Sequence, residues 1–113
     1  MTVLSKANSD RIRQLNDSFR QTFAGGTVVL TQGVDALSAE VKAEVLPRVR
    51  DFNRFDRDND PHGEHDFGSF EIADQRFFFK VDYYNLEMDG GSEDPADPTK
   101  TARVLTVMKA EEY

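Results

Sequence analysis

The chain has 113 residues, enough for one domain with a modest core, and its lack of cysteine excludes disulfides and cysteine-ligated metals. Its net charge of −7 is unevenly divided: residues 1–55 carry 8 Lys/Arg against 6 Asp/Glu (+2), whereas residues 56–113 carry 6 against 15 (−9). The acidic half disfavours binding to DNA, RNA or anionic lipid and favours basic partner surfaces. We see no apolar leader and no run of membrane-spanning length, so we expect a cytoplasmic protein.

Residues 9–23 predict a helix, because apolar side chains from Ile12 to Phe23 recur at three- and four-residue spacing. Asn8 or Ser9 is the expected N-terminal cap, and Gly25-Gly26 the expected end. The arginines of this segment, Arg20 among them, are assigned to the polar faces.

Residues 27–31 read as a short buried strand, since they are rich in β-branched side chains. Residues 38–53 predict a second helical stretch, capped by Asp35 or Ser38. Pro47 lies inside it, so either the helix kinks there or two short helices meet.

The second half of the chain predicts strands separated by acidic loops. Residues 56–66 read as a loop, followed by strands at 67–72, 76–84 and 102–108. The segment 76–84 is the clearest, because Phe77, Phe79 and Val81 alternate with more polar positions. Residues 85–99 read as a long exposed loop. Helix remains the alternative for residues 102–112.

This order of elements predicts an α+β domain spanning residues 1–113. We expect an antiparallel sheet of three to four strands with two helices packed on one face. The strand at 102–108 is expected to pair with the strand at 76–84.

The segment from His62 to Asp66 contains residue types that bind divalent metals, and His62, Glu64, His65 and Asp66 are weak candidate ligands. A hydrolytic site with His65 as base is the related alternative. The loop setting does not match the helical zinc-protease motif, and no nucleophile pattern accompanies it. The structural interpretation is that His65 and Asp66 bind backbone groups and pin the loop to the next strand.

We therefore expect a binding protein more than an enzyme, with no catalytic residue and no cofactor. Acidic side chains in the two loops are the candidate partner-binding residues. A ridge of carboxylates can imitate the regular phosphate charge of duplex DNA; the alternative is a loop that is simply solvated. The candidates are Asp56, Asp58, Asp60, Glu87, Asp89, Glu93, Asp94 and Asp97.

Long sequence blocks resemble a bacterial family of unknown function. The blocks are residues 59–68 (NDPHGEHDFG), 80–84 (KVDYY), 91–98 (GSEDPADP), 101–108 (TARVLTVM) and 112–113, with 16–17, 25–31 and 49–52 upstream. Phe79 stands where the family pattern leads us to expect Trp. The family has no assigned activity, so the resemblance implies no catalytic residues.

The resemblance implies a setting, since members of this family are small proteins of proteobacterial plasmids and prophages. Such elements often encode inhibitors of host defence. Together with the negative C-terminal half, this implies an anti-CRISPR or anti-restriction inhibitor, monomeric or homodimeric, that binds a basic nucleic-acid groove on a protein partner. A third hypothesis is a structural or regulatory module that dimerises. It predicts an exposed apolar patch, for which Phe78 and Tyr84 are candidates.

Overall fold

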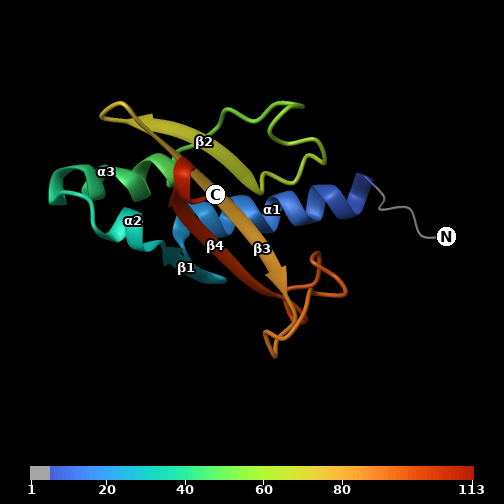
Figure 1. Cartoon of the computed structure of the whole chain (residues 1–113). Coiled ribbons are helices and arrows are strands. Elements are labelled where there is room, and N and C mark those ends of the chain that lie inside the picture. The colour runs from blue at the N-terminus through green and yellow to red at the C-terminus, as the bar shows by residue number, and fades with distance from the viewer. Residues whose placement is uncertain (1–5) are drawn as a thin grey trace.

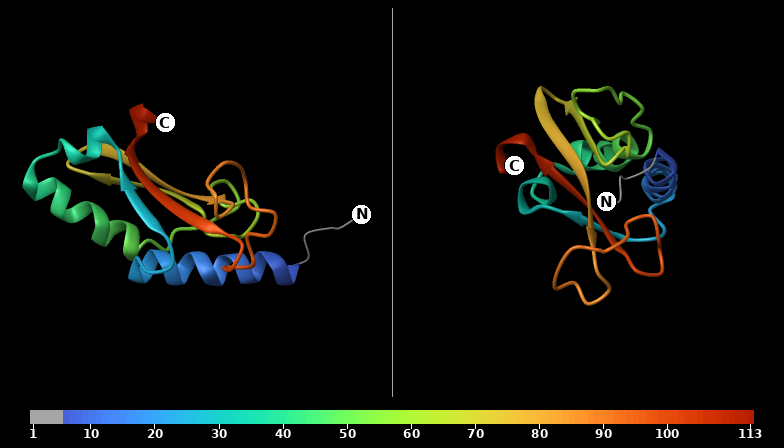
Figure 2. Two further views of the ribbon diagram at one scale, coloured as in Figure 1. Left: turned by 90° about the horizontal axis from the view of Figure 1, so that it is seen from below. Right: turned by 90° about the vertical axis from the view of Figure 1, so that its right-hand side faces the viewer.

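The computed structural model describes residues 6–113; the first five residues, where we expected no leader, lie outside them. Four strands form one sheet in the order β1-β4-β3-β2, with the long helices on one side of it (Figures 1 and 2). The predicted α+β class is confirmed. The elements are α1 Lys6–Thr22, β1 Thr27–Leu30, α2 Gln32–Asp35, α3 Ala39–Arg50, β2 Phe67–Ile72, β3 Gln75–Tyr84, β4 Ala102–Lys109 and the 3-10 helix η1 Ala110–Glu112.

The sheet is mixed, which corrects the purely antiparallel sheet expected from the sequence. β3 pairs antiparallel with both β2 and β4, as predicted, but β1 pairs parallel with β4. The long connection from β1 to β4, which contains two helices and a hairpin, lets the chain return in the same direction. β4 is a full strand, so the helical alternative for residues 102–112 is wrong except for the single turn of η1.

Helix α1 begins earlier than predicted, so Asn8 and Ser9 lie inside it and do not cap it. It ends at Thr22, just before Phe23, which has a φ of 58°. Ile12 and Phe19 are buried as predicted, but Arg20 is only 2% exposed, so its assignment to a polar face was wrong.

Helix α3 confirms Ser38 as the cap, because the Ser38 side chain accepts the N–H of Val41 at 3.3 Å. The helix continues through Pro47 to Arg50 and does not divide. Val45 and Val49, on either side of the proline, are buried against the sheet, and this packing holds the segment helical despite the missing donor.

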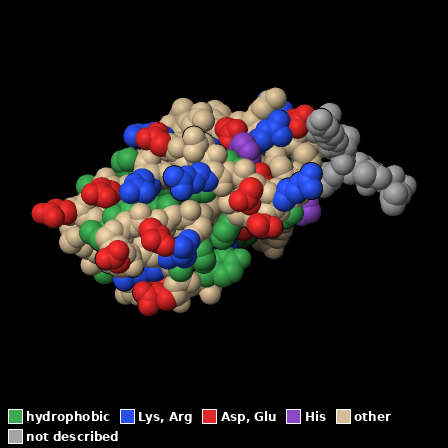
Figure 3. Space-filling model, turned by 90° about the horizontal axis from the view of Figure 1, so that it is seen from above, with side chains coloured by type: hydrophobic (Ala, Val, Ile, Leu, Met, Phe, Trp, Pro, Cys, Tyr) green, Lys and Arg blue, Asp and Glu red, His purple; other side chains and the backbone are tan. Residues whose placement is uncertain are grey.

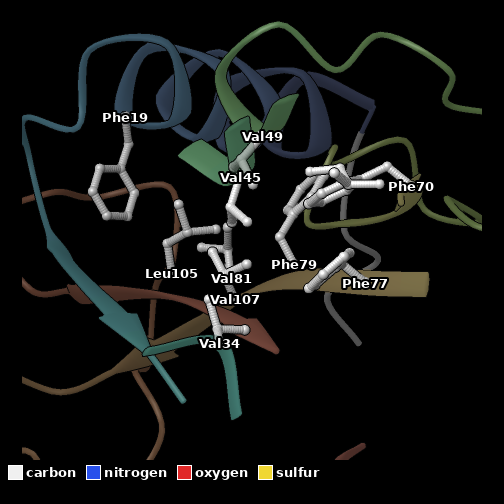
Figure 4. Close-up of a cluster of buried hydrophobic side chains, with 11 residues drawn as sticks. Phe19, Val34, Val45, Val49, Phe70, Phe77, Phe79, Val81, Leu105 and Val107 are labelled. Carbon is white, nitrogen blue, oxygen red and sulfur yellow. The ribbon is translucent and has the colours of Figure 1, made fainter. Parts of the chain in front are cut away.

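The core lies between the helices and the inner face of the sheet (Figure 4). Phe77, Phe79 and Val81 point into it from β3, as their alternation predicted. A Cβ on Gly68 would lie 2.2 Å from the Phe79 ring, so only glycine lets β2 pass this close to the packed aromatics. The core residues are Phe19, Val34, Val45, Val49, Phe70, Ile72, Phe77, Phe79, Val81, Leu105 and Val107.

Within residues 6–113, no helix combines the length and apolar character needed to cross a bilayer.

Candidate functional site

The loop between α3 and β2 is folded around the carboxylate of Asp60. This side chain is buried, and its Oδ1 accepts the N–H groups of Glu64 at 2.9 Å and His65 at 3.2 Å. These bonds hold His65 at a φ of 55°, a conformation that non-glycine residues rarely adopt. Asp60 is therefore an internal anchor of this loop.

The ring of His65 is held on three sides. Its Nδ1 lies 2.8 Å from Oδ1 of Asp17 on α1, and its Nε2 lies 3.7 Å from Oδ2 of Asp60. One face of the ring stacks on Phe55 at a centroid distance of 3.8 Å. His65 therefore has a structural role, but its ring contacts the side chains of Asp17, Asp60 and Phe55 and not the backbone groups expected from the sequence.

A buried polar network lies beneath this loop, centred on Asn16 of α1. The Asn16 Nδ2 donates to the backbone oxygen of Glu64 at 3.0 Å and to the hydroxyl oxygen of Tyr83 at 2.8 Å. The Tyr83 hydroxyl donates to the Glu64 carboxylate at 3.0 Å, and Nε of Arg103 donates to Oδ1 of Asn16 at 2.9 Å. Asn16, Glu64 and Arg103 are all buried, so each of these bonds satisfies a group shielded from water.

The network connects α1 to both long loops. Glu64 belongs to the loop before β2, and Arg103 also donates through Nη2 to the backbone oxygen of Pro95 in the loop between β3 and β4. The guanidinium of Arg103 lies over the Tyr83 ring, 5.3 Å from its centroid. Asn16 is thus the common support of the two acidic segments.

Burial sets the protonation behaviour of this cluster. It raises the pKa of Tyr83, so the hydroxyl remains a hydrogen-bond donor at neutral pH, and it lowers the pKa of Arg103. Two surface hollows have volumes of about 430 and 400 Å³. The first is lined by residues of 48–54 and 69–76 and the second by residues of 85–100, and neither lining includes Asn16, Glu64, Tyr83 or Arg103.

The four weak metal candidates do not converge. His62 is exposed, Glu64 bonds Tyr83, and His65 bonds Asp17. Among the residues that the structure describes, no three His, Asp or Glu side chains are placed to hold a metal ion. A metal-dependent or hydrolytic site therefore stays a prediction from sequence.

Asp66 gives a pH-dependent prediction. Burial, followed by repulsion from Glu64, raises the pKa of Asp66 in the folded protein. Because the folded pKa exceeds the unfolded one, the Asp66 contribution lowers stability as pH rises through this window. Asp66→Asn is therefore expected to be as stable as the parent or more so at pH 7, and to lose that advantage at pH 3. Urea unfolding at both pH values tests this; an advantage that grows on acidification contradicts it.

The loop from Asn85 to Lys100 carries five acidic residues, of which Glu87, Asp89 and Glu93 are exposed. It starts as a tight turn in which the Asn85 side chain donates to Asp89 at 2.7 Å and the backbone of Asn85 bonds Gly90. Further along, Asp94 accepts the N–H of Ala96, and Asp97 accepts both the N–H and the hydroxyl of Thr99. The Thr99 bonds lower the pKa of Asp97, so this carboxylate is firmly ionised.

The eight predicted partner-binding residues fall into two groups that lie apart, on either side of the end of β3 (Figures 1 and 2). Asp56 and Asp58 are exposed in one loop, while Asp60 beside them is buried. The other group lies in the loop after β3 and consists of Glu87, Asp89, Glu93, Asp94 and Asp97. The structure does not join all eight into one ridge. On the surface shown in Figure 3, acidic and basic side chains are interspersed.

Sequence reasoning missed the buried polar residues Asn16, Arg20 and Arg103, whereas Tyr83 was placed on the inward face of its strand. Asn16 lies four residues after Ile12 and three before Phe19, so its place on the apolar stripe of α1 was a usable signal. Tyr83 continues the inward alternation of β3, and Arg103 that of β4. Arg20 offered no comparable signal, because a buried cation is rare.

A family model described as "protein of unknown function (DUF3768)" matches residues 30–112, and the chain belongs to this family. No curated protein and no solved structure matched the chain. The matched region covers every strand except the first three residues of β1, together with both acidic loops.

Proposed function

We propose that this protein is a non-enzymatic inhibitor or accessory protein of a mobile element. It binds a basic nucleic-acid-binding surface on a host defence complex, of the CRISPR or restriction type, and competes there with DNA. The loop from Asn85 to Lys100 is the binding surface.

One observation carries this proposal: the carboxylates of this loop are dense and held in fixed positions. Two of them, Asp94 and Asp97, accept bonds from the backbone of the loop itself, and the Tyr84–Gly91 bridge closes its first turn on β3. Fixed anions lose little conformational entropy on binding, as a DNA mimic requires. Charge supports the same conclusion, since the C-terminal half carries the whole negative excess.

The proposed surface is narrower than the eight-residue ridge expected from sequence. Asp60 is left out because its side chain is buried and bonded to the backbone. Asp56 and Asp58 lie in the separate loop and form a second negative region. Lys100 lies 3.6 Å from Glu93 and offsets part of the charge, so the effective surface centres on Glu87, Asp89 and Asp97 with Glu93 at its edge.

Glu87 and Glu93 are the best residues for a test, because both are exposed. The contact of Glu93 within the loop is a solvent-exposed ion pair with Lys100 at 3.6 Å, which contributes little to stability. The double variant Glu87→Lys/Glu93→Lys is expected to weaken inhibition of DNA binding at least tenfold, a loss of about 1.4 kcal/mol. The assay is competition for labelled duplex DNA on a panel of purified restriction enzymes and CRISPR effectors. Inhibition by the parent should fall steeply with added salt.

The matched control is Glu40→Lys/Glu44→Lys on α3, which makes the same charge change at exposed positions away from the loop. This control should inhibit like the parent. The proposal is wrong if the parent inhibits no member of the panel, or if the loop variant and the α3 variant inhibit equally well.

A further inference from the structure

The face of the sheet turned away from α1 and α3 has no second layer of described residues over it (Figure 2, left). The strand register places outward side chains in rows: Phe78 beside Met108, Lys80 beside Thr106, and Asp82 beside Val104. Val29 of β1 extends the second row on one side, and Phe67 of β2 extends it on the other.

This outer face carries polar and apolar side chains together: β3 turns Lys80 and Asp82 outward beside Phe78, whereas β4 is mostly apolar. Antiparallel strands with one wet face normally alternate apolar and polar side chains. β4 instead reads Val104-Leu105-Thr106-Val107-Met108, a pattern typical of a strand covered on both faces. Val29 is 41% exposed, and Phe67, Phe78, Tyr84 and Val104 are partly exposed.

The C-terminal Tyr113 covers only a corner of this face. Its ring meets Phe78 and Phe67 edge-on at 5.5 and 6.1 Å, yet the residue itself remains 76% exposed. The contact adds an aromatic side chain to the patch and does not close it. Phe67, Phe78 and Tyr113 thus form one aromatic cluster on this face, and exposed apolar surface of this kind marks an interaction surface.

The charges on this face are balanced, which permits a second copy of the chain as its occupant. Lys80 pairs with Asp82 at 2.6 Å, and Arg76 pairs with Glu71 at 2.5 Å, so the strand side chains carry no net charge across the patch. The whole molecule carries −7. The outer face is therefore a surface on which a second, equally acidic copy meets no repulsion.

We propose that two copies of this chain associate through the outer faces of their sheets. In a two-fold arrangement Lys80 of each copy meets Asp82 of the other, which makes the face self-complementary. The acidic loop after β3 projects beyond the end of the sheet and stays free (Figure 2, right). The inference does not depend on the proposed function.

The size of the face sets the expected affinity. Four strands at ~4.8 Å spacing make a face about 20 Å wide, and packing two such faces buries on the order of 1,000 Å² in total. This lies at the small end of specific interfaces, so the dimer is expected to dissociate in the micromolar range. The average molecular mass of the protein in solution should therefore rise with its concentration between about 1 and 300 µM.

The test is sedimentation velocity of the full chain over that range, with Phe78→Arg and its control Leu86→Arg. Phe78 belongs to the aromatic cluster of the outer face, whereas Leu86 is 59% exposed in the loop after β3 and lies outside this face. Phe78→Arg should be monomeric throughout, and Leu86→Arg should dimerise like the parent. Circular dichroism confirms that each variant is folded.

Exchanging the charges of Lys80 and Asp82 distinguishes a specific dimer from non-specific hydrophobic association. It changes no core side chain. Lys80→Asp alone should weaken dimerisation at least tenfold, and Lys80→Asp/Asp82→Lys should restore it, because the exchanged charges again meet their opposites in the two-fold mate. A monomer at every concentration overturns the proposal. So does a dimer that survives Phe78→Arg, or a double exchange that fails to recover.

Discussion

Replacing Arg20 with methionine is expected to lower the free energy of unfolding by about 3 kcal/mol. Arg20 lies on α1, and its Nη1 is within 2.8–3.0 Å of the backbone oxygens of Val49, Arg50 and Phe52, where α3 ends. These oxygens have few helical partners left, so the guanidinium satisfies them from outside the helix. A cation at this terminus also opposes the partial negative charge of the helix dipole.

The loss is expected to be large because methionine fills the space of the side chain but removes the donor that the three oxygens share, which leaves Val49 O with backbone N–H donors only. Part of the cost is offset, since Nε of Arg20 is itself buried without a partner. Arg20→Lys should recover less than half of the loss, because one ammonium group cannot reproduce the planar fork.

Urea unfolding followed by circular dichroism measures the effect. Arg11→Met, an exposed change on the same helix, is the control and should shift stability by less than about 0.5 kcal/mol. If Arg20→Met unfolds at the same urea concentration as Arg11→Met, the guanidinium is not holding α3 in place.

Some of the fold was predictable because the residues that set it repeat at the period of their element. The inward residues of β3 alternate without a break, and its short connection to β2 made the hairpin a direct inference. Ser38 was one of the two caps predicted for α3, with Asp35 as the other, and the structure selects Ser38. These are local signals, and each depends on a few neighbouring residues.

The parts that were not predictable depend on distant partners. Nothing in residues 27–31 indicates that β1 runs parallel to β4, because alternation specifies a face and not a direction. The burial of Arg20 depends on backbone oxygens some 30 residues away. The division of the acidic residues into two separate groups likewise depends on where β2 and β3 end in space.

The loop before β2 contains one side chain whose role was predicted from the sequence and one whose role was not. His65 was expected to pin its loop, and it does so, but its partner Asp17 lies 48 residues away on α1. Asp60 was expected to face a partner, and it is turned inward instead because two backbone N–H groups need an acceptor. Leaving a buried backbone N–H without an acceptor costs more free energy than removing the Asp60 carboxylate from water.

Replacing Asn16 with leucine is expected to have the second large effect, again about 3 kcal/mol. The change removes two donated bonds, to Glu64 and Tyr83, and the acceptor of Arg103. Asn16 has no exposed surface, so water cannot replace these bonds without rearrangement. Gln14→Leu, an exposed change on the same helix, should be nearly neutral.

The same variant tests whether the buried network supports the acidic loop. Arg103 bonds both Asn16 and the backbone oxygen of Pro95. When Asn16 is replaced, the guanidinium loses one of these partners, so residues 92–98 should open locally at a lower free energy than the sheet. Hydrogen exchange should therefore show faster exchange in this loop and in residues 62–66, with β3 and β4 unchanged.

A double variant measures the coupling of Asn16 and Arg103. Asn16→Leu/Arg103→Met should lose at least 1 kcal/mol less stability than the sum of the two single changes, because Arg103→Met removes the cation that Asn16→Leu leaves unpaired. Strict additivity, or a loop that exchanges as in the parent, would mean that the two acidic segments are held independently of α1.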